Sequence, residues 1–147
     1  MNVTAIGVGA FYGCKSLASI EIPESVTEIG GSAFRGSGLK TVTIPKGVKA
    51  IGMETFKDCE SLESITLPRG VTEIGTDAFW ECTSLKSLSI PRSVTKIDDY
   101  AFRDCNNLTV QYDGTKAQWE AIKRGRWGIG SFALRCSDGE FNKQEWR

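Results

Sequence analysis

The sequence contains no histidine among its 147 residues. This absence excludes Ser-His-Asp and Cys-His nucleophile systems, histidine metal sites and the commonest acid-base side chain of enzymes. Lysine plus arginine equals aspartate plus glutamate at 18 each, so no overall charge draws the chain toward nucleic acid or a membrane surface. No apolar run approaches the roughly 20 residues of a membrane span, and the N-terminus lacks the basic and apolar regions of a signal peptide. We therefore expect no cofactor, no nucleic-acid partner and no membrane insertion.

A repeat of 22 or 23 residues occupies most of the chain. Phenylalanines recur at spacings of 23, 22, 23 and 23 residues, at Phe11, Phe34, Phe56, Phe79 and Phe102. The same shift aligns leucines at Leu17, Leu39, Leu62, Leu85 and Leu108, isoleucines at Ile29, Ile51, Ile74 and Ile97, and prolines at Pro23, Pro45, Pro68 and Pro91. Self-similarity at a fixed period in this range is the signature of stacked repeats, so it outranks any local assignment of helix or strand.

The unit that begins at Leu62 shows what one repeat can form. The alternation around Ile65 and Leu67 predicts a short half-buried strand, which Pro68 ends because proline cannot donate to a ladder. Gly75 lies where a turn needs a permissive backbone, and the Ala-Phe segment after it is long enough for only one or two helical turns. One unit buries too few side chains to offset the entropy of ordering it, so each unit is expected to be one coil of a solenoid.

The fullest motif reads I-P-x-x-V-T-x-I-G-x-x-A-F-x-x-C-x-S-L, and the copy that starts at Ile90 departs from it at Asp98 and Asn107. Over residues 3 to about 108 the sequence resembles the BspA-type leucine-rich repeats of bacterial surface proteins. The resemblance implies an α/β repeat solenoid, a right-handed, horseshoe-like superhelix of short parallel β-strands. It also implies that the solenoid serves in binding, often in adhesion, although folds of this kind host many partners.

The pattern changes after Leu108, and we divide the chain there. Residues 1–112 are the repeats, the first of them partial, and residues 113–141 are expected to form a helical C-terminal cap followed by a strand. The capping box Thr115-x-x-Gln118 predicts that this helix begins there and ends near Gly125, with Trp119 and Ile122 covering the end of the stack. Residues 142–147 are polar and are expected to form a loosely held tail.

Four of the five cysteines share one repeat position, three residues after the phenylalanine: Cys14, Cys59, Cys82 and Cys105. We interpret them as a ladder of small, buried, reduced thiols, with Ser37 in the same slot of the second unit. Disulfides between neighbours are the alternative, although equivalent side chains on stacked coils point the same way. A zinc site is not expected, because no second cysteine or histidine lies two to four residues from any of these cysteines. Cys136 stands outside the ladder and could be free.

Three sets of side chains are candidates for contacting a partner. The outward strand positions, which are almost all Ser and Thr, could bind a ligand or could simply pair across strands. Cations after the prolines could bind an anionic glycan or acidic partner, or could be solvated and ion-paired. An exposed indole after Phe79 would be a contact residue. The candidate residues are Glu21, Thr43, Thr66 and Ser89 on the strands, Lys46, Arg69 and Arg92 after the prolines, and Trp80.

No group of side chains predicts catalysis, since the available carboxylates lie at turn positions on an open surface. We therefore expect a non-enzymatic module that binds a protein or a glycan, with bacterial adhesion or host interaction as the role that the resemblance implies. Alternatives are an intracellular interaction scaffold or a self-assembling repeat protein. The chain opens inside a repeat without a cap, so a homodimer could form through residues 3–11. The expected location is the cell surface or the exterior if the full gene adds a signal peptide, and the cytoplasm if Met1 is the natural start.

Overall fold

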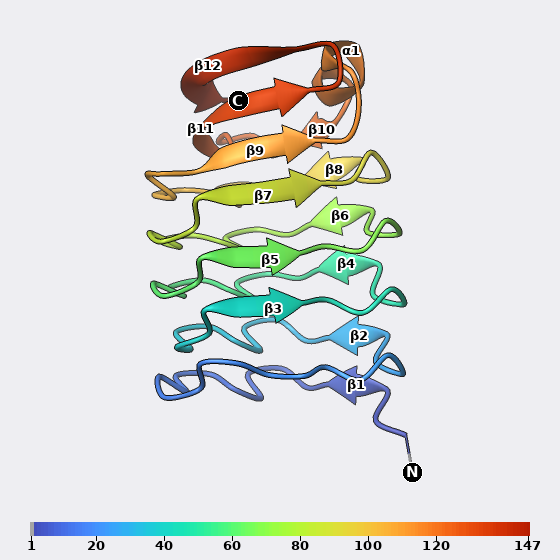
Figure 1. The fold of residues 1–147 in the computed structure, drawn as a ribbon, viewed down its shortest axis with the longest axis vertical. Coiled ribbons are helices and arrows are strands. Elements are labelled where there is room, and N and C mark those ends of the chain that lie inside the picture. The colour runs from blue at the N-terminus through green and yellow to red at the C-terminus, as the bar shows by residue number, and fades with distance from the viewer. Residues whose placement is uncertain (1) are drawn as a thin grey trace.

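The computed structural model describes residues 2–147, which wind into coils stacked along the long axis of the molecule (Figure 1). Two ladders of parallel strands run along the stack. The first ladder consists of β3 (Thr41–Thr43), β5 (Ser64–Thr66), β7 (Ser87–Ile90), β9 (Thr109–Tyr112) and β11 (Gly130–Cys136). The second consists of β1 (Ala5–Ile6), β2 (Glu28–Ile29), β4 (Ala50–Ile51), β6 (Glu73–Ile74), β8 (Lys96–Ile97) and β10 (Lys123–Arg124).

The first ladder confirms the parallel repeat solenoid that the sequence predicts. Strands one repeat apart pair in parallel, as Thr41 with Ser64 and Ser87 with Thr109, although β5 and β7 lie side by side in separate hydrogen-bonded sheets. Side chains alternate between solvent and core, so a three-residue strand has one buried position between two exposed ones. The right-handed, horseshoe-like curvature implied by the resemblance stays a prediction.

The second ladder was not predicted. Its strands are two residues long, with one isoleucine facing the core in most of them, as in the register Ile51, Ile74 and Ile97. Two residues are too short to show an alternating pattern in the sequence. The ladder forms because the backbone of each coil finds its hydrogen-bond partners on the neighbouring coil.

A column of phenylalanine rings forms the centre of the stack. The rings of Phe11, Phe34, Phe56, Phe79 and Phe102 follow one another at centroid distances of 5.3 to 5.5 Å, with planes within 8° of parallel. The last four rings are fully buried, and the aligned leucines and isoleucines pack around them. The 22- and 23-residue period therefore sets the positions of the core side chains within the repeats.

The Ala-Phe segments are turns and not the helical turns that their length suggested. In the unit of Phe34, the amides of Ala33 and Arg35 donate within the turn to residues three positions back, while those of Ser32 and Phe34 donate to the next coil. This alternation is incompatible with a helix, whose amides all donate to their own segment. Seven non-glycine turn residues have φ between 57° and 61°: Ser32, Glu54, Asp58, Asp77, Glu81, Tyr100 and Asp104.

The motif glycine serves a purpose other than the predicted permissive backbone. Gly30 and Gly75 do not have the positive φ that would require glycine. A Cβ on Gly30 would lie 2.5 Å from the backbone nitrogen of Val8, and one on Gly75 would lie 2.9 Å from the carbonyl carbon of Gly52. Glycine is therefore needed at these two positions because the backbones of adjacent coils approach closely, whereas a Cβ on Gly52 would lie 3.6 Å from its nearest atom and Asp98 fills the same slot in a later coil.

The C-terminal cap is mostly β-structure, so the prediction of a helical cap is wrong. Helix α1 (Lys116–Glu120) has five residues and ends well before Gly125. Strand β11 extends the first ladder, and β12 (Gly139–Trp146) folds back antiparallel beside it. The segment predicted to be a loose tail, residues 142–147, lies largely in β12, because it pairs with β11 and buries Trp146.

Two predictions about the cap are confirmed. The Thr115 side chain accepts from the Gln118 amide, and the Gln118 side chain accepts from the Thr115 amide, so the capping box forms. Trp119 and Ile122 are buried against the end of the stack. Phe132 meets Phe102 edge-on at 5.6 Å and 79°, which ends the column of parallel rings.

Candidate functional site

The exposed side of β3, β5, β7 and β9, which we call the strand face, is flat and rich in hydroxyl groups. Thr43, Thr66 and Ser89, three of the predicted contact residues, are exposed there at equivalent positions of successive coils. They face outward because the residues beside them in β3, β5 and β7, such as Val42, Ile65 and Leu88, are buried. The fourth, Glu21, lies in the first coil outside the assigned strands and lines a shallow hollow with Thr43.

The predicted row of cations runs along the edge of the strand face, one residue after each proline. Lys46, Arg69 and Arg92 are all exposed. The row is not uniformly positive, however, because the Arg92 guanidinium lies 3.8 Å from the carboxylate of Asp113, an ion pair in which both side chains are largely solvent-exposed. Glu24 occupies the equivalent position in the first coil. Such exposed pairs contribute little to stability, but they lower the net charge that an anionic partner would meet.

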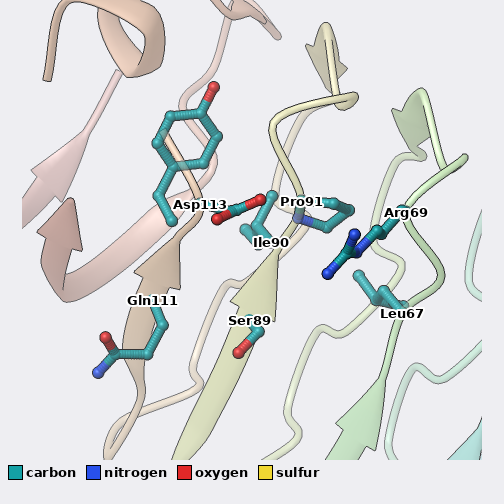
Figure 2. A pocket seen from close by; sticks show the side chains of 8 residues that line it. Leu67, Arg69, Ser89, Ile90, Pro91, Gln111 and Asp113 are labelled. Carbon is teal, nitrogen blue, oxygen red and sulfur yellow. The ribbon is translucent and has the colours of Figure 1, made fainter. Parts of the chain in front are cut away.

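A groove of about 350 Å³ lies where the strand face meets this edge, between the coils of β5, β7 and β9 (Figure 2). In Figure 2, Arg69 and Asp113 lie on either side of Pro91, and Ser89 and Gln111 extend from neighbouring strands. A second hollow shares Arg69, Pro91 and Asp113 and adds Arg92. The groove therefore brings together two predicted residues, Arg69 and Ser89, while the second hollow adds Arg92 at its border.

One wall of the groove departs from the repeat, because the last coil carries different residues there. In the register of β7 and β9, Ser89 pairs with Gln111 and Ile90 with Tyr112, which places Asp113 beside Pro91 in the slot that proline fills in the other coils. Sequence reasoning missed Gln111, Tyr112 and Asp113 as site residues. The repeat spacing did not reveal them, because Gly114 stands six residues after Leu108, where the other units have proline, and only the register of the strands brings Asp113 into that slot.

Trp80 lies outside the groove and is only half-buried, held by neighbours on the two adjacent coils. Its indole nitrogen donates to the carboxylate of Asp104 at 3.1 Å, and the Lys57 ammonium lies 4.5 Å from its ring centroid. The Arg103 guanidinium lies 4.8 Å from the same ring. These contacts give the indole a role in joining coils through cation–π interactions.

The turns around the phenylalanines lie above one another along the stack, and we call this row of turns the turn column. Its charged side chains form a network between neighbouring coils. Arg35 contacts Glu54 at 2.7 Å and Asp58 at 3.6 Å, and Lys57 contacts Asp77 at 3.7 Å. Burial raises the pKa of Asp77 above its usual value, although the Lys57 ammonium opposes that shift. The network links neighbouring coils, and the geometry does not place its carboxylates in the groove.

The Glu81 carboxyl also has a raised pKa, first from desolvation and then from the negative charges of Asp58 and Asp104 on the adjacent coils. Like charges at one repeat position oppose ionisation because the coils stack closely. The raised pKa of Glu81 therefore arises on the turn column, away from the strand face.

The cysteine ladder is confirmed for three of its four members. Cys59, Cys82 and Cys105 are buried, and each thiol donates to the carbonyl of the phenylalanine one coil earlier, at 3.0 to 3.1 Å. All five cysteines are free, and Cys14 is exposed because it lies in the first coil. Burial raises the pKa of the Cys59 and Cys82 thiols, so these groups are poor nucleophiles at neutral pH.

Clusters of metal ligands and membrane-spanning helices are both absent from the described part of the chain. Among residues 2–147, His, Cys, Asp and Glu side chains do not form any group of three or more that could hold a metal ion. In the same residues, no helix has both the length and the apolar character that crossing a bilayer requires.

Comparisons with known proteins agree with the geometry. The family model of the BspA type leucine rich repeat region matches residues 1–109 in six copies. A search of curated proteins finds no match.

Three solved structures are similar to the chain. A leucine-rich repeat protein from Bacteroides ovatus is 38% identical with a TM-score of 0.71, over 76% of this chain and 31% of that protein. A leucine rich cell surface protein from Faecalibacterium prausnitzii is 39% identical with a TM-score of 0.80, over 82% of this chain and 32% of that protein. The T. pallidum leucine rich repeat protein is 29% identical with a TM-score of 0.66, over 84% of this chain and 67% of that protein. The chain thus spans about a third of the length of the first two.

Proposed function

Because the chain belongs to the BspA-type leucine-rich repeat family, we propose that it is a non-enzymatic module that binds a macromolecule through the strand face. The observation that carries this proposal is the strand face itself, a flat and exposed set of hydroxyl side chains on a rigid ladder that ends in a groove of mixed charge. The carboxyls with raised pKa values, Asp77 and Glu81, lie on the turn column, which favours binding over catalysis.

The partner in this proposal is a protein or a glycan outside a bacterial cell. The Faecalibacterium prausnitzii structure is described as a cell surface protein, which supports a surface or secreted location and a role in adhesion or host interaction. An interaction scaffold inside the cell is the alternative. Among the predicted residues, Thr43, Thr66, Ser89 and Arg69 lie where such a partner would contact the strand face, whereas Trp80 lies on a different column.

The proposal is tested by binding of the purified chain to arrays of immobilised extracellular proteins and glycans. The double variant Thr43→Glu, Thr66→Glu adds two charges to the centre of the strand face without touching the core. We expect it to weaken every specific binding signal by at least about tenfold, because unpaired buried charge is costly in an interface. The matched control is Thr27→Glu, Thr72→Glu, which adds the same charges beside the second ladder. Equal losses in both variants, or a substrate turned over by the chain, would contradict the proposal.

A second candidate function is self-assembly through the first coil. Val8 is 82% exposed and Tyr12 is 56% exposed there, and the Phe11 ring, whose equivalents are fully buried, is covered on one face only. We propose that a second copy covers this surface and forms a homodimer. Light scattering over a concentration series should show a dimer that Phe11→Asp abolishes. A monomer at all concentrations would reject this second candidate and leave the strand-face proposal standing.

A further inference from the structure

We infer that the groove between Arg69 and Asp113 binds an uncharged carbohydrate. This inference rests on the proposed function and names the ligand class for one end of the strand face. It concerns a site that the repeat pattern does not supply, since Gln111, Tyr112 and Asp113 replace the residues found in the other coils.

The polar groups of the groove are complementary to sugar hydroxyls. Arg69 can only donate hydrogen bonds, and ionised Asp113 can only accept them, while Ser89 and Gln111 can do both. A hydroxyl group donates and accepts at once, so a ring that carries several hydroxyls can satisfy all four side chains. A ligand of one charge sign would instead face a like charge from Arg69 or from Asp113.

The charge balance of the edge supports an uncharged ligand. Arg69 and Asp113 contribute one charge of each sign to the lining of the groove, and Asp113 also lies 3.8 Å from the guanidinium of Arg92. Because that ion pair is largely exposed, the Asp113 carboxylate stays accessible from solvent. An acidic glycan would be drawn to Arg69 and Arg92 but would have to approach this carboxylate.

The remaining lining is apolar. Leu67 and the ring carbons of Tyr112 reach the groove with 8% and 5% of their surfaces exposed, Ile90 lies beneath them fully buried, and the ring of Pro91 lies between Arg69 and Asp113. The C–H face of a pyranose ring can pack on such a floor while its hydroxyls reach the rim. Tight protein–protein interfaces are usually anchored by aromatic or arginine side chains. The strand face beside the groove carries small hydroxyl side chains instead.

The groove is held rigidly. Ser89 and Gln111 belong to paired strands, and the Asp113 amide donates to the Ile90 carbonyl at 3.0 Å. The opposite wall comes from the adjacent coil, which carries Leu67 and Arg69. Little order has to be imposed on binding, which favours even a small ligand in a shallow site of about 350 Å³.

The test uses saturation-transfer NMR on the full chain with a panel of uncharged methyl glycosides, and with the corresponding uronic acid glycosides as anionic probes. At least one uncharged glycoside should bind, and Asp113→Asn and Gln111→Ala should each weaken its binding by about fivefold to tenfold, the usual loss for one polar contact. Lys86→Ala is the matched control, because it removes an exposed cation from the coil of β7 outside the groove. It should leave binding unchanged.

Three results would overturn the inference. One is tighter binding of the uronic acid probes, strengthened by Asp113→Asn, which would identify an anion site. Another is sugar binding that both groove variants leave unchanged while their unfolding midpoints equal that of the parent chain. The third is an absence of binding to every glycoside in the panel. Array binding that depends on Thr43 and Thr66 would still support the proposed function in that case, so the two failures are distinguishable.

Discussion

The two ends of the stack carry equivalent apolar side chains in different surroundings. At the first coil, Phe11 stacks on Phe34 on one side and has no ring on the other, and Val8 is 82% exposed. At the last coil, Phe102 is fully buried because Phe132 and the cap cover it, with Trp119 and Trp146 packed behind. A repeat therefore does not bury its own core residue. Burial comes from the coil or cap stacked on each side.

Truncating Trp119, which closes the last coil, should have the largest effect on the free energy of unfolding. Trp119 is fully buried and contacts Tyr112, Phe132 and Trp146. We expect Trp119→Ala to lower the free energy of unfolding by about 3–5 kcal/mol, as for other large aromatic truncations. Phe11→Ala at the open end should cost roughly 1 kcal/mol, because that ring is partly exposed and stacks on Phe34 alone among the described rings. Urea unfolding measures both, and equal losses would contradict the difference between the ends.

The cysteine ladder gives the second comparison, without any mutation. Cys14 is exposed, and Cys82 is buried with a raised pKa. Under native conditions we expect Cys14 to react with iodoacetamide at least about 100-fold faster than Cys82, because Cys82 needs the stack to open before its thiol can react. Mass spectrometry of peptides from timed samples gives the two rates. Similar rates in the folded protein would show that the interior coils open as readily as the first.

Removing the thiol of Cys82 or of Cys14 should change the free energy of unfolding by less than removing the Trp119 side chain. Cys82→Ala leaves the Phe56 carbonyl with the Cys59 amide as its remaining donor and opens a small cavity, at an expected cost of about 1–3 kcal/mol. Cys14→Ala should cost at most about 0.5 kcal/mol, as for most exposed positions. Cys82→Ser restores a donor and should recover most of the loss, since Ser37 already fills this slot in one coil. Thermal unfolding midpoints rank the three variants.

The smallest effect concerns the charges on the turns. Glu81 has negative neighbours, Asp58 and Asp104, whereas Gly13 and Gly36 hold the same position in the first coils. Its raised pKa means that the folded state binds this proton more tightly, so its contribution to stability is greatest below about pH 4.5 and is lost as pH rises through the folded value.

Glu81→Gln should therefore stabilise the protein at pH 7, by up to about 0.5 kcal/mol after solvent screening. The gain should vanish at about pH 3, well below the ordinary pKa of 4.5, where the carboxyl is protonated in both states. Urea unfolding at the two pH values measures the difference. A loss of stability at pH 7 would mean that the glutamate has a favourable partner that outweighs its acidic neighbours.

The repeat pattern was enough to predict the first ladder and the burial of three of the four thiols, and it aligned the phenylalanines that form the column. These features depend on residues that recur at one spacing, so the sequence displays them several times. The second ladder was missed because its strands are two residues long, and the motif glycine was misinterpreted because its role depends on the distance between coils. Neither the pairing of two-residue strands nor the distance between coils can be seen in the sequence of one repeat.

The cap and the groove were harder to predict because each occurs once. Strand β12 is largely polar, since one of its faces is exposed, and its sequence alone suggested a loose tail. The groove requires knowledge of register, which places Asp113 beside Pro91 and Gln111 beside Ser89. The positions of Thr43, Thr66 and Ser89 on one face follow from alternation, but their role in binding stays a prediction.

The ring column also has a consequence for how such a protein can change its length. Each repeat of 22 or 23 residues adds about one ring spacing, 5.3 to 5.5 Å, to the stack. Whole coils inserted below β5 would move the groove outward in steps of that size without altering its walls, because those walls are built by β5, β7, β9 and the turn that follows β9. Genetic duplication or loss of a repeat could thus set the reach of the groove while leaving its selectivity unchanged.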